Sequence, residues 1–260
     1  LYDEVGGGVL PMIVFNESLD RDEEASKALS QGLTKVGKYR KVSVGDSWNP
    51  RCMDTNGCKL DECKNTLSCR SETPNTLELF VMSQCPYGVM ALDAMKEVLA
   101  NLDKKLNLRV HYIANGDAQK GFQALHGQPE VDENIRGLCA AKYYAKDRKY
   151  MDYIWCRNPN IQSSDWKSCT GSNGIAAQKI SACAEGKEGP QLHEEDIKVA
   201  NSLSIGGSPT WIVNGRHKFS GVDAETIRRN VCQHNPALKG CDKKLSETKG
   251  QVPEGAGCGK

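Results

Sequence analysis

The sequence predicts an α/β protein whose main domain spans residues 76–241 of the 260-residue chain. Three strand patterns predict it: an apolar run at 77–82, a second at 108–114, and a third at 210–215 that follows the segment Gly-Gly-Ser-Pro. The first strand runs directly into Cys85, and Pro86 opens a helix behind it. Two strands joined by one helix favour a right-handed parallel pair in a buried sheet.

A helical insert is expected at about 123–203, because apolar residues recur there at helical spacing. Segments 139–156 and 173–184 would form an antiparallel hairpin. That arrangement predicts two nested disulfides, Cys139 with Cys183 and Cys156 with Cys169, and a third bridge that closes a short loop between Cys232 and Cys241. Each bridge would stabilise the fold by about 2–4 kcal/mol.

A small α/β segment is expected at residues 1–50, with a strand at 9–16, a helix over 20–36 and a strand at 39–44. Residues 10–16 and 208–214 share a pattern of proline, four mostly apolar residues and asparagine. Two explanations stay open: coincidence, or a first unit of the same fold of which residues 1–50 are the closing half. The second explanation implies that the chain is part of a longer or processed polypeptide.

Twelve cysteines dominate the composition, and no two of them have the spacing Cys-x-x-Cys. Disulfides in an oxidising compartment are therefore expected. Four of the cysteines lie in a Cys-rich linker at 51–75 that is too polar to build a core: Cys52, Cys58, Cys63 and Cys69. Four cysteines allow three pairings, which the sequence leaves open. A metal site is the alternative, but the spacings of six, five and six lack the short gaps of zinc sites.

Charge and hydropathy exclude other classes. Lys+Arg is 34 and Asp+Glu is 33, so the net charge of +1 lacks the basic excess of a nucleic-acid binder. No run of 18 apolar residues occurs, so no transmembrane segment is expected. The chain opens on Leu1 without a signal-peptide pattern, which favours a mature or truncated product. The Gly-rich, polar tail at 242–260 is expected to be flexible.

Cys85 is the sharpest candidate for chemistry. A thiol at a helix start faces unsatisfied backbone N–H groups and the positive end of the helix dipole, and both stabilise the thiolate. The thiolate is the nucleophile of disulfide exchange. Pro86, Tyr87 and Gly88 complete the segment, and Pro209 stands before the last buried strand. The alternative is a buried, inert cysteine and an ordinary trans proline.

Cys85 at a strand–helix junction and Pro209 before a later strand form the frame of a thioredoxin-like fold. Residues 77–241 resemble the DsbA-like thiol oxidoreductases, and more closely the gamma-interferon-inducible lysosomal thiol reductases. The resemblance rests on three stretches: Ala124-Leu125-His126-Gly127 with Glu130, Asn134 and Cys139; the run from Cys183 to Leu192; and the run from Pro209 to Gly215. Two cysteines of the family signature are replaced by Ala124 and Val131. The resemblance implies a cis bond at Pro209 and protein thiols or disulfides as partners.

One departure from the family concerns its Cys-x-x-Cys active site, which here reads Cys85-Pro86-Tyr87-Gly88. A dithiol enzyme releases its mixed disulfide through the second thiol. Three interpretations stay open: Cys258 in the tail resolves the mixed disulfide, an external thiol does so, or the domain has lost redox activity.

The sequence therefore predicts an extracytoplasmic thiol-disulfide oxidoreductase-like protein that acts through Cys85, without a metal or other cofactor. The compartment would be the periplasm, the extracellular space or another oxidising one. The alternative from a different class is a redox-inactive thioredoxin-like subunit of a larger periplasmic or extracellular assembly. Soft-metal binding by Cys85 and neighbouring thiols is a third, weaker hypothesis.

Overall fold

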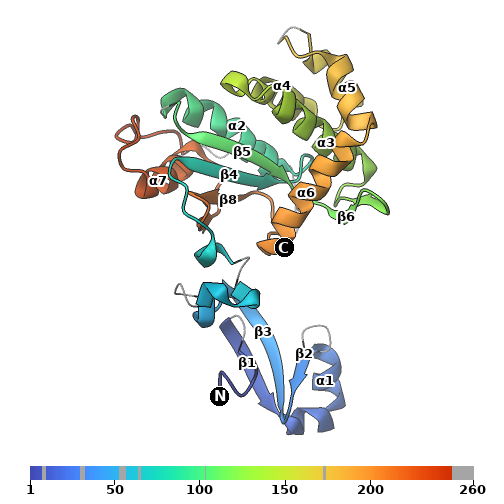
Figure 1. The fold of residues 1–260 in the computed structure, drawn as a ribbon, viewed down its shortest axis with the longest axis vertical. Coiled ribbons are helices and arrows are strands. Elements are labelled where there is room, and N and C mark those ends of the chain that lie inside the picture. The colour runs from blue at the N-terminus through green and yellow to red at the C-terminus, as the bar shows by residue number, and fades with distance from the viewer. Residues whose placement is uncertain are drawn as a thin grey trace. The chain divides into compact units, whose positions relative to one another are not determined.

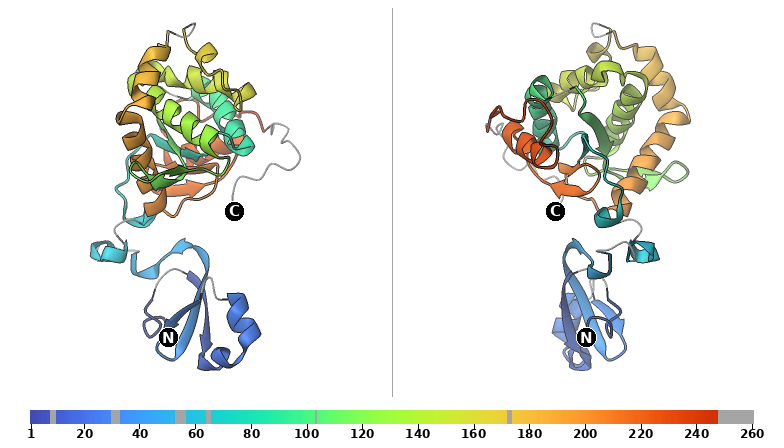
Figure 2. Two further views of the ribbon diagram at one scale, coloured as in Figure 1. Left: turned by 90° about the vertical axis from the view of Figure 1, so that its right-hand side faces the viewer. Right: turned by 60° about the vertical axis from the view of Figure 1, so that its left-hand side comes forward.

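The computed structural model describes residues 1–7, 10–29, 33–52, 57–63, 66–102, 104–171 and 174–247. The chain divides into two compact units, Leu1–Arg70 and Ser71–Lys260, and each is described by itself. Figure 1 shows the elements of both units, and Figure 2 gives two further views. The domain limits expected from the sequence stay predictions.

The smaller unit is built on a three-stranded antiparallel sheet. It contains β1 (Leu10–Asn16), α1 (Glu23–Leu29), β2 (Leu33–Val36) and β3 (Tyr39–Trp48), with the strand order β1-β3-β2. The expectation of one helix over 20–36 is wrong, because Leu33–Val36 pairs with β3 instead. Val36 lies opposite Tyr39, so Gly37 sits in a two-residue hairpin turn, where its φ of +56° suits glycine.

The order strand, helix, strand, strand of this unit differs from the strand, strand, helix order that closes a thioredoxin-like domain. The Leu10–Pro11 bond is nevertheless cis, as is the Ser208–Pro209 bond. The relation between the two segments stays a prediction. Short 3₁₀ turns follow β3, and two disulfides connect them, Cys52–Cys63 and Cys58–Cys69. These bonds select one of the three pairings that the sequence left open.

The larger unit contains a four-stranded sheet with the order β5-β4-β8-β9. The strands are β4 (Thr76–Val81), β5 (Asn107–Tyr112), β8 (Thr210–Val213) and β9 (His217–Phe219). As expected, β4 and β5 are parallel and joined by α2 (Pro86–Asn101), whereas β8 is antiparallel to β4. All six residues of β4 are buried, because helices cover the central strand of the sheet. The last helix, α7 (Ala224–His234), packs against α2.

Four helices of the insert lie between β5 and β8: α3 (Gln128–Tyr143), α4 (Tyr150–Arg157), α5 (Ala177–Glu185) and α6 (Glu188–Ser202). They contact one another, and α3 and α6 also contact β5. In Figure 1 they lie above and to the right of the strands, and α7 lies on the left. Residues 115–123 form a small hairpin, β6 (Asn115–Asp117) with β7 (Gly121–Gln123), that the sequence did not predict.

The start of the expected flexible tail is held in place. Leu245 is buried, its backbone N–H donates to the Glu225 carboxylate at 2.8 Å, and Ser246 N–H donates to Glu97 at 3.1 Å. Residues 248–260, including Cys258, lie outside the described part of the chain.

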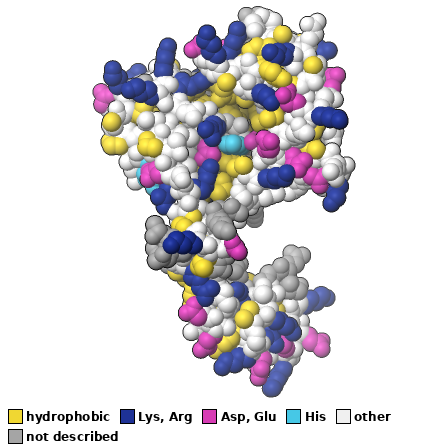
Figure 3. Space-filling view, viewed as in Figure 1, with side chains coloured by type: hydrophobic (Ala, Val, Ile, Leu, Met, Phe, Trp, Pro, Cys, Tyr) yellow, Lys and Arg dark blue, Asp and Glu magenta, His cyan; other side chains and the backbone are white. Residues whose placement is uncertain are grey.

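Two surface properties bear on function. Figure 3 shows cationic and anionic side chains interspersed over the visible face of the larger unit rather than gathered in one basic patch. Within the described residues, none of the helices combines the length and the hydropathy needed to cross a bilayer.

Candidate functional site

Cys85 is the N-cap residue of α2. The strand β4 ends at Val81, and the turn 82–85 is closed by a bond from Cys85 N–H to the Met82 carbonyl at 3.0 Å. Pro86 then takes the first helical position, where a missing N–H costs nothing. The Gly88 N–H donates to Cys85 Sγ at 3.4 Å, so a free backbone donor of the helix start faces the sulfur.

The sulfur of Cys85 is fully buried and disulfide-bonded in this structure. The ten other described cysteines form five bridges among themselves: Cys52–Cys63, Cys58–Cys69, Cys139–Cys183, Cys156–Cys169 and Cys232–Cys241. The last three bridges join the pairs that the sequence analysis expects.

The turn that carries Pro209 lies against Cys85. The Ser208 carbonyl oxygen is 3.5 Å from Cys85 Sγ, and the Ser208–Pro209 bond is cis. The Ser208 hydroxyl accepts a bond from Met82 N–H at 3.0 Å. The structure thus joins two segments that are 123 residues apart in the sequence, and it adds Ser208, which sequence reasoning missed.

Gly88 stands where the family has its second cysteine, and the space for a side chain there is filled. A Cβ at this position would lie 2.8 Å from Ser208 Oγ and 3.1 Å from the Met82 carbonyl oxygen. Real Cβ contacts are almost never that short. The replacement of the resolving cysteine by glycine is therefore part of the packing of the turn around Ser208.

Tyr87 is the exposed residue of the Cys85–Gly88 segment, with 37% of its surface accessible. A cavity of about 270 Å³ has Gln84, the residue before Cys85, among its lining residues, together with Arg136 and Trp166.

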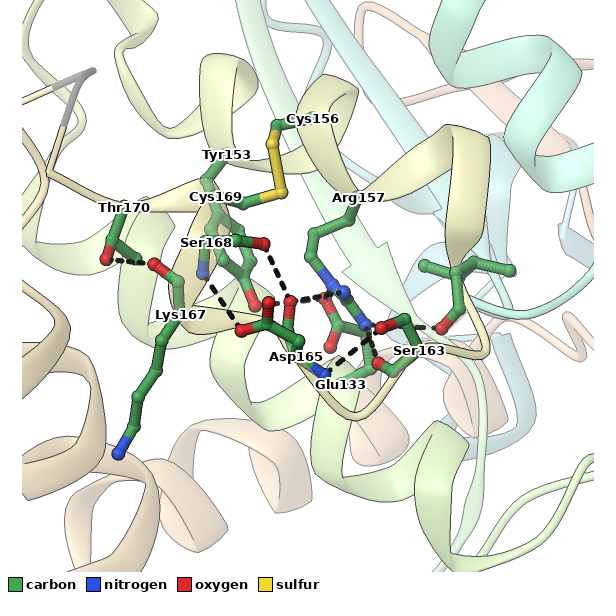
Figure 4. The surroundings of a disulfide bond; sticks show 11 residues. Glu133, Tyr153, Cys156, Arg157, Ser163, Asp165, Lys167, Ser168, Cys169 and Thr170 are labelled. Atoms are coloured by element: carbon green, nitrogen blue, oxygen red, sulfur yellow. Dashed lines mark hydrogen bonds and ion pairs between the residues drawn. A yellow bond between two sulfur atoms is a disulfide. The ribbon is translucent and has the colours of Figure 1, made fainter.

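The insert around the site is braced by a buried ion pair and a disulfide. Arg157 is 3% exposed, and its guanidinium Nε donates to Glu133 Oε1 at 3.0 Å. Figure 4 shows the Cys156–Cys169 bridge above this pair, with Ser163 and Asp165 facing the guanidinium. The carbonyl oxygens of Ser163 and Asp165 accept from it at 2.7 and 3.4 Å. The loop after α4 is thereby fastened to α3, the helix that carries Glu133.

A second buried charge cluster connects β5 to α6. His111 Nδ1 lies 2.7 Å from Asp196 Oδ1, and its Nε2 lies 3.7 Å from Glu78. Burial opposes the charge on His111, but the hydrogen bond to Asp196 and the nearby carboxylate of Glu78 outweigh it and raise the pKa to about 9. His193 has no such partner among the described residues, and burial lowers its pKa to about 4 despite the nearby Asp196. This cluster stabilises the insert on the sheet.

Within the described residues, no three or more His, Cys, Asp or Glu side chains converge on one point. The four cysteines of the linker, for which the sequence left a metal site open, are consumed by two disulfides.

Comparisons with known proteins agree with the predicted resemblance. Residues 76–173 match the family model of gamma interferon inducible lysosomal thiol reductase (GILT). A comparison with curated proteins gave no match.

Several solved thiol-disulfide exchange proteins resemble the chain. The protein alpha-DsbA2 from Wolbachia pipientis is 15% identical, with a TM-score of 0.45, over 63% of this chain and 86% of its own. BdbD from Bacillus subtilis is 14% identical, with a TM-score of 0.47, over 61% and 86%. MdbA from Actinomyces oris is 11% identical, with a TM-score of 0.46, over 64% and 83%.

The fold class predicted from the sequence is confirmed. The parallel pair β4–β5 joined by α2, the antiparallel strands β8 and β9, and the closing helix α7 make a thioredoxin-like domain. A disulfide-stapled helical insert interrupts this domain. Residues 76–173 of the chain, which include the start of the insert, match the GILT family model.

Proposed function

We propose that the larger unit is an extracytoplasmic thiol-disulfide oxidoreductase whose nucleophile is Cys85. One observation carries the proposal: Cys85 Sγ sits at the start of α2, where it receives the Gly88 N–H, and beside the Ser208–Pro209 turn. A helix start lowers the energy of a thiolate, and the turn presents a backbone carbonyl next to the sulfur. Five disulfides among the described residues fit an oxidising compartment.

We further propose that Cys258 is the resolving thiol, because it is the one cysteine besides Cys85 that takes no part in those five bridges. The Cys85 thiolate attacks a protein disulfide, forms a mixed disulfide and expels one substrate thiolate, which takes up a proton. The Cys258 thiolate then attacks Cys85 Sγ and releases the second substrate thiol. The substrate gains two electrons, and the Cys85–Cys258 pair is oxidised until an external thiol reduces it.

Insulin reduction in the presence of a dithiol reductant tests both proposals. Cys85→Ser should abolish the catalysed rate. Cys258→Ser, reduced, freed of reductant and then mixed with insulin, should accumulate a mixed disulfide at Cys85, seen as a mass adduct, that only added thiol releases. The matched control is the double variant Cys232→Ser/Cys241→Ser, which removes a structural bridge and should keep the activity. Equal rates for the wild type and Cys85→Ser would rule out the enzyme.

The complete burial of Cys85 favours one other function, a redox-inactive subunit of a larger extracytoplasmic assembly. In that case Cys85→Ser changes neither insulin reduction nor assembly size. Light scattering on material from its native source would then show a particle larger than the chain.

A further inference from the structure

The turn in front of Cys85 is held from outside by one helix, α3. The Gln84 N–H donates to Glu130 Oε1 at 2.8 Å, and the Ser83 N–H donates to Asn134 Oδ1 at 3.3 Å. The Ser83 hydroxyl donates to the Glu130 backbone carbonyl at 3.3 Å. Two consecutive backbone N–H groups next to Cys85 thus depend on side chains about 50 residues further along the chain, because neither is paired within the sheet or α2.

Glu130 itself is fully buried, and within the described residues its carboxylate contacts two backbone N–H groups and one imidazole nitrogen. Besides Gln84 N–H, these are the backbone N–H and the ring Nδ1 of His126, at 3.1 and 2.9 Å. The two backbone N–H groups donate to the carboxylate, and its place in the first turn of α3 adds the favourable helix dipole. The contacts with His126 therefore fix the position of the carboxylate that accepts from Gln84 N–H.

Asn134 shows that this arrangement is not a gain in stability alone. It is fully buried, its Oδ1 accepts from Ser83 N–H, and its Nδ2 has no partner among the described residues. A buried donor without an acceptor costs more than one neutral hydrogen bond returns. An apolar side chain there would leave the Ser83 N–H unpaired, so the contribution of Asn134 to this turn is that one bond.

We propose that Glu130 is a positioning residue for Cys85. Its carboxylate, fixed by His126, holds the Gln84 N–H and so sets where the turn presents the sulfur to a substrate disulfide, with Asn134 as the second support. This inference rests on the proposed exchange function for its catalytic readout. It also gives His126, Glu130 and Asn134 a common role, which is to hold the turn before Cys85. These residues lie in the part of the chain that matches the thiol reductase family model.

The experiment compares two substitutions of the same residue. Glu130→Gln keeps an acceptor oxygen for Gln84 N–H but removes the charge, whereas Glu130→Ala removes both. After brief reduction, alkylation of Cys85 by iodoacetamide is followed across a pH series by mass spectrometry of its peptide. Insulin reduction and the melting temperature are measured for the same proteins.

The two readouts should move in opposite directions. Loss of a like charge favours the thiolate, so both variants should alkylate about threefold faster near pH 6. Insulin reduction should stay within about threefold for Glu130→Gln but fall about tenfold or more for Glu130→Ala, because the sulfur is misplaced. A variant that is merely destabilised would not combine a faster small-molecule reaction with a slower protein reaction.

The matched control is Glu225→Gln. Like Glu130, Glu225 is a buried residue in the first turn of a helix, here α7. Its carboxylate also accepts a backbone N–H, that of Leu245 at 2.8 Å. It should leave the alkylation profile of Cys85 unchanged. The inference is overturned if both Glu130 variants alkylate like the wild type, or if Glu225→Gln produces the same change. If no protein reduces insulin, the exchange function fails while the alkylation profiles still test Glu130. If Glu130→Ala does not fold, Glu130→Gln carries that test.

Discussion

The contact between Gly88 and Ser208 gives a sharp quantitative prediction. Gly88→Ala adds one methyl group to α2, and that carbon would lie 2.8 Å from Ser208 Oγ. In a helix, alanine is favoured over glycine by about 1 kcal/mol. Overpacking of a buried site costs about 1–3 kcal/mol. The net destabilisation should therefore be about 0–2 kcal/mol, which is the overpacking cost less the gain in helix propensity.

Ser208→Ala removes the obstructing hydroxyl but also the acceptor of the Met82 N–H. An unpaired buried donor costs about 1–3 kcal/mol, so this variant is destabilised as well. In the double variant the new methyl group occupies the vacated space. The two changes should then cost less together than their sum, by about 0.5–3 kcal/mol, the range seen for residues in contact.

Urea unfolding of the four proteins, followed by circular dichroism, measures this coupling. Gly206→Ala is the matched control, because a Cβ there meets nothing within 4 Å and the residue belongs to the same segment as Ser208. It should be neutral in both backgrounds. Additive effects of Gly88→Ala and Ser208→Ala would refute the steric reasoning, since they would show that the two positions do not compete for space.

Three further predictions concern the insert. Removing the Cys139–Cys183 bridge, which spans 44 residues, with a double alanine variant should lower the free energy of unfolding by about 4 kcal/mol in a urea titration; a loss below about 1 kcal/mol would contradict the loop-entropy estimate. The raised pKa of His111 contributes stability that is complete below about pH 6.5 and is lost as the pH rises toward 9, so His111→Asn should flatten the pH dependence of unfolding in that interval, and an unchanged slope would count against the ion pair. The lowered pKa of His193 has the opposite consequence: stability falls as the pH drops from about 6.5 to 4, where only the unfolded chain takes up the proton, and His193→Leu should remove that loss in thermal melts.

The parts of the fold that the sequence predicted depend on local signals. The strand that ends before Cys85 is an apolar run, and Pro86 marks the helix start, so both could be placed from a dozen residues. The nested bridges of the insert followed from cysteine spacing on two helical segments. Local patterns of this kind survive tertiary packing when propensity and burial agree.

The errors arose where one local pattern fitted two structures. Residues 33–36 read Leu-Thr-Lys-Val, which continues a helical spacing but also alternates as a strand. Pairing with β3 decided for the strand, and no local signal reports a partner strand. The hairpin at 115–123 was missed for a related reason, because its strands have three residues each.

The contacts that define the candidate site could not be read from the sequence, because they join distant segments. Met82 and Ser208 are 126 residues apart, and Gln84 and Glu130 are 46 apart. Glu130 and Asn134 were visible only as matches to a family pattern, without a role. The sequence did contain one signal, because a glutamate and an asparagine four residues apart lie on the same face of a helix. The structure shows that both are buried, which is unusual for polar residues.

The geometry separates two tasks that a Cys-x-x-Cys motif combines. Stabilising a thiolate at Cys85 needs only the helix start, and the Gly88 N–H supplies it without a second sulfur. Resolving a mixed disulfide needs a second thiol, and a side chain at position 88 would have to displace the Ser208 hydroxyl, which accepts from Met82 N–H. A single substitution at Gly88 would therefore recreate the dithiol motif only with a shift of the Ser208 side chain. The second thiol has to come from elsewhere in the chain or from another molecule, so the rate of resolution would depend on how that thiol is delivered, independently of how reactive Cys85 is.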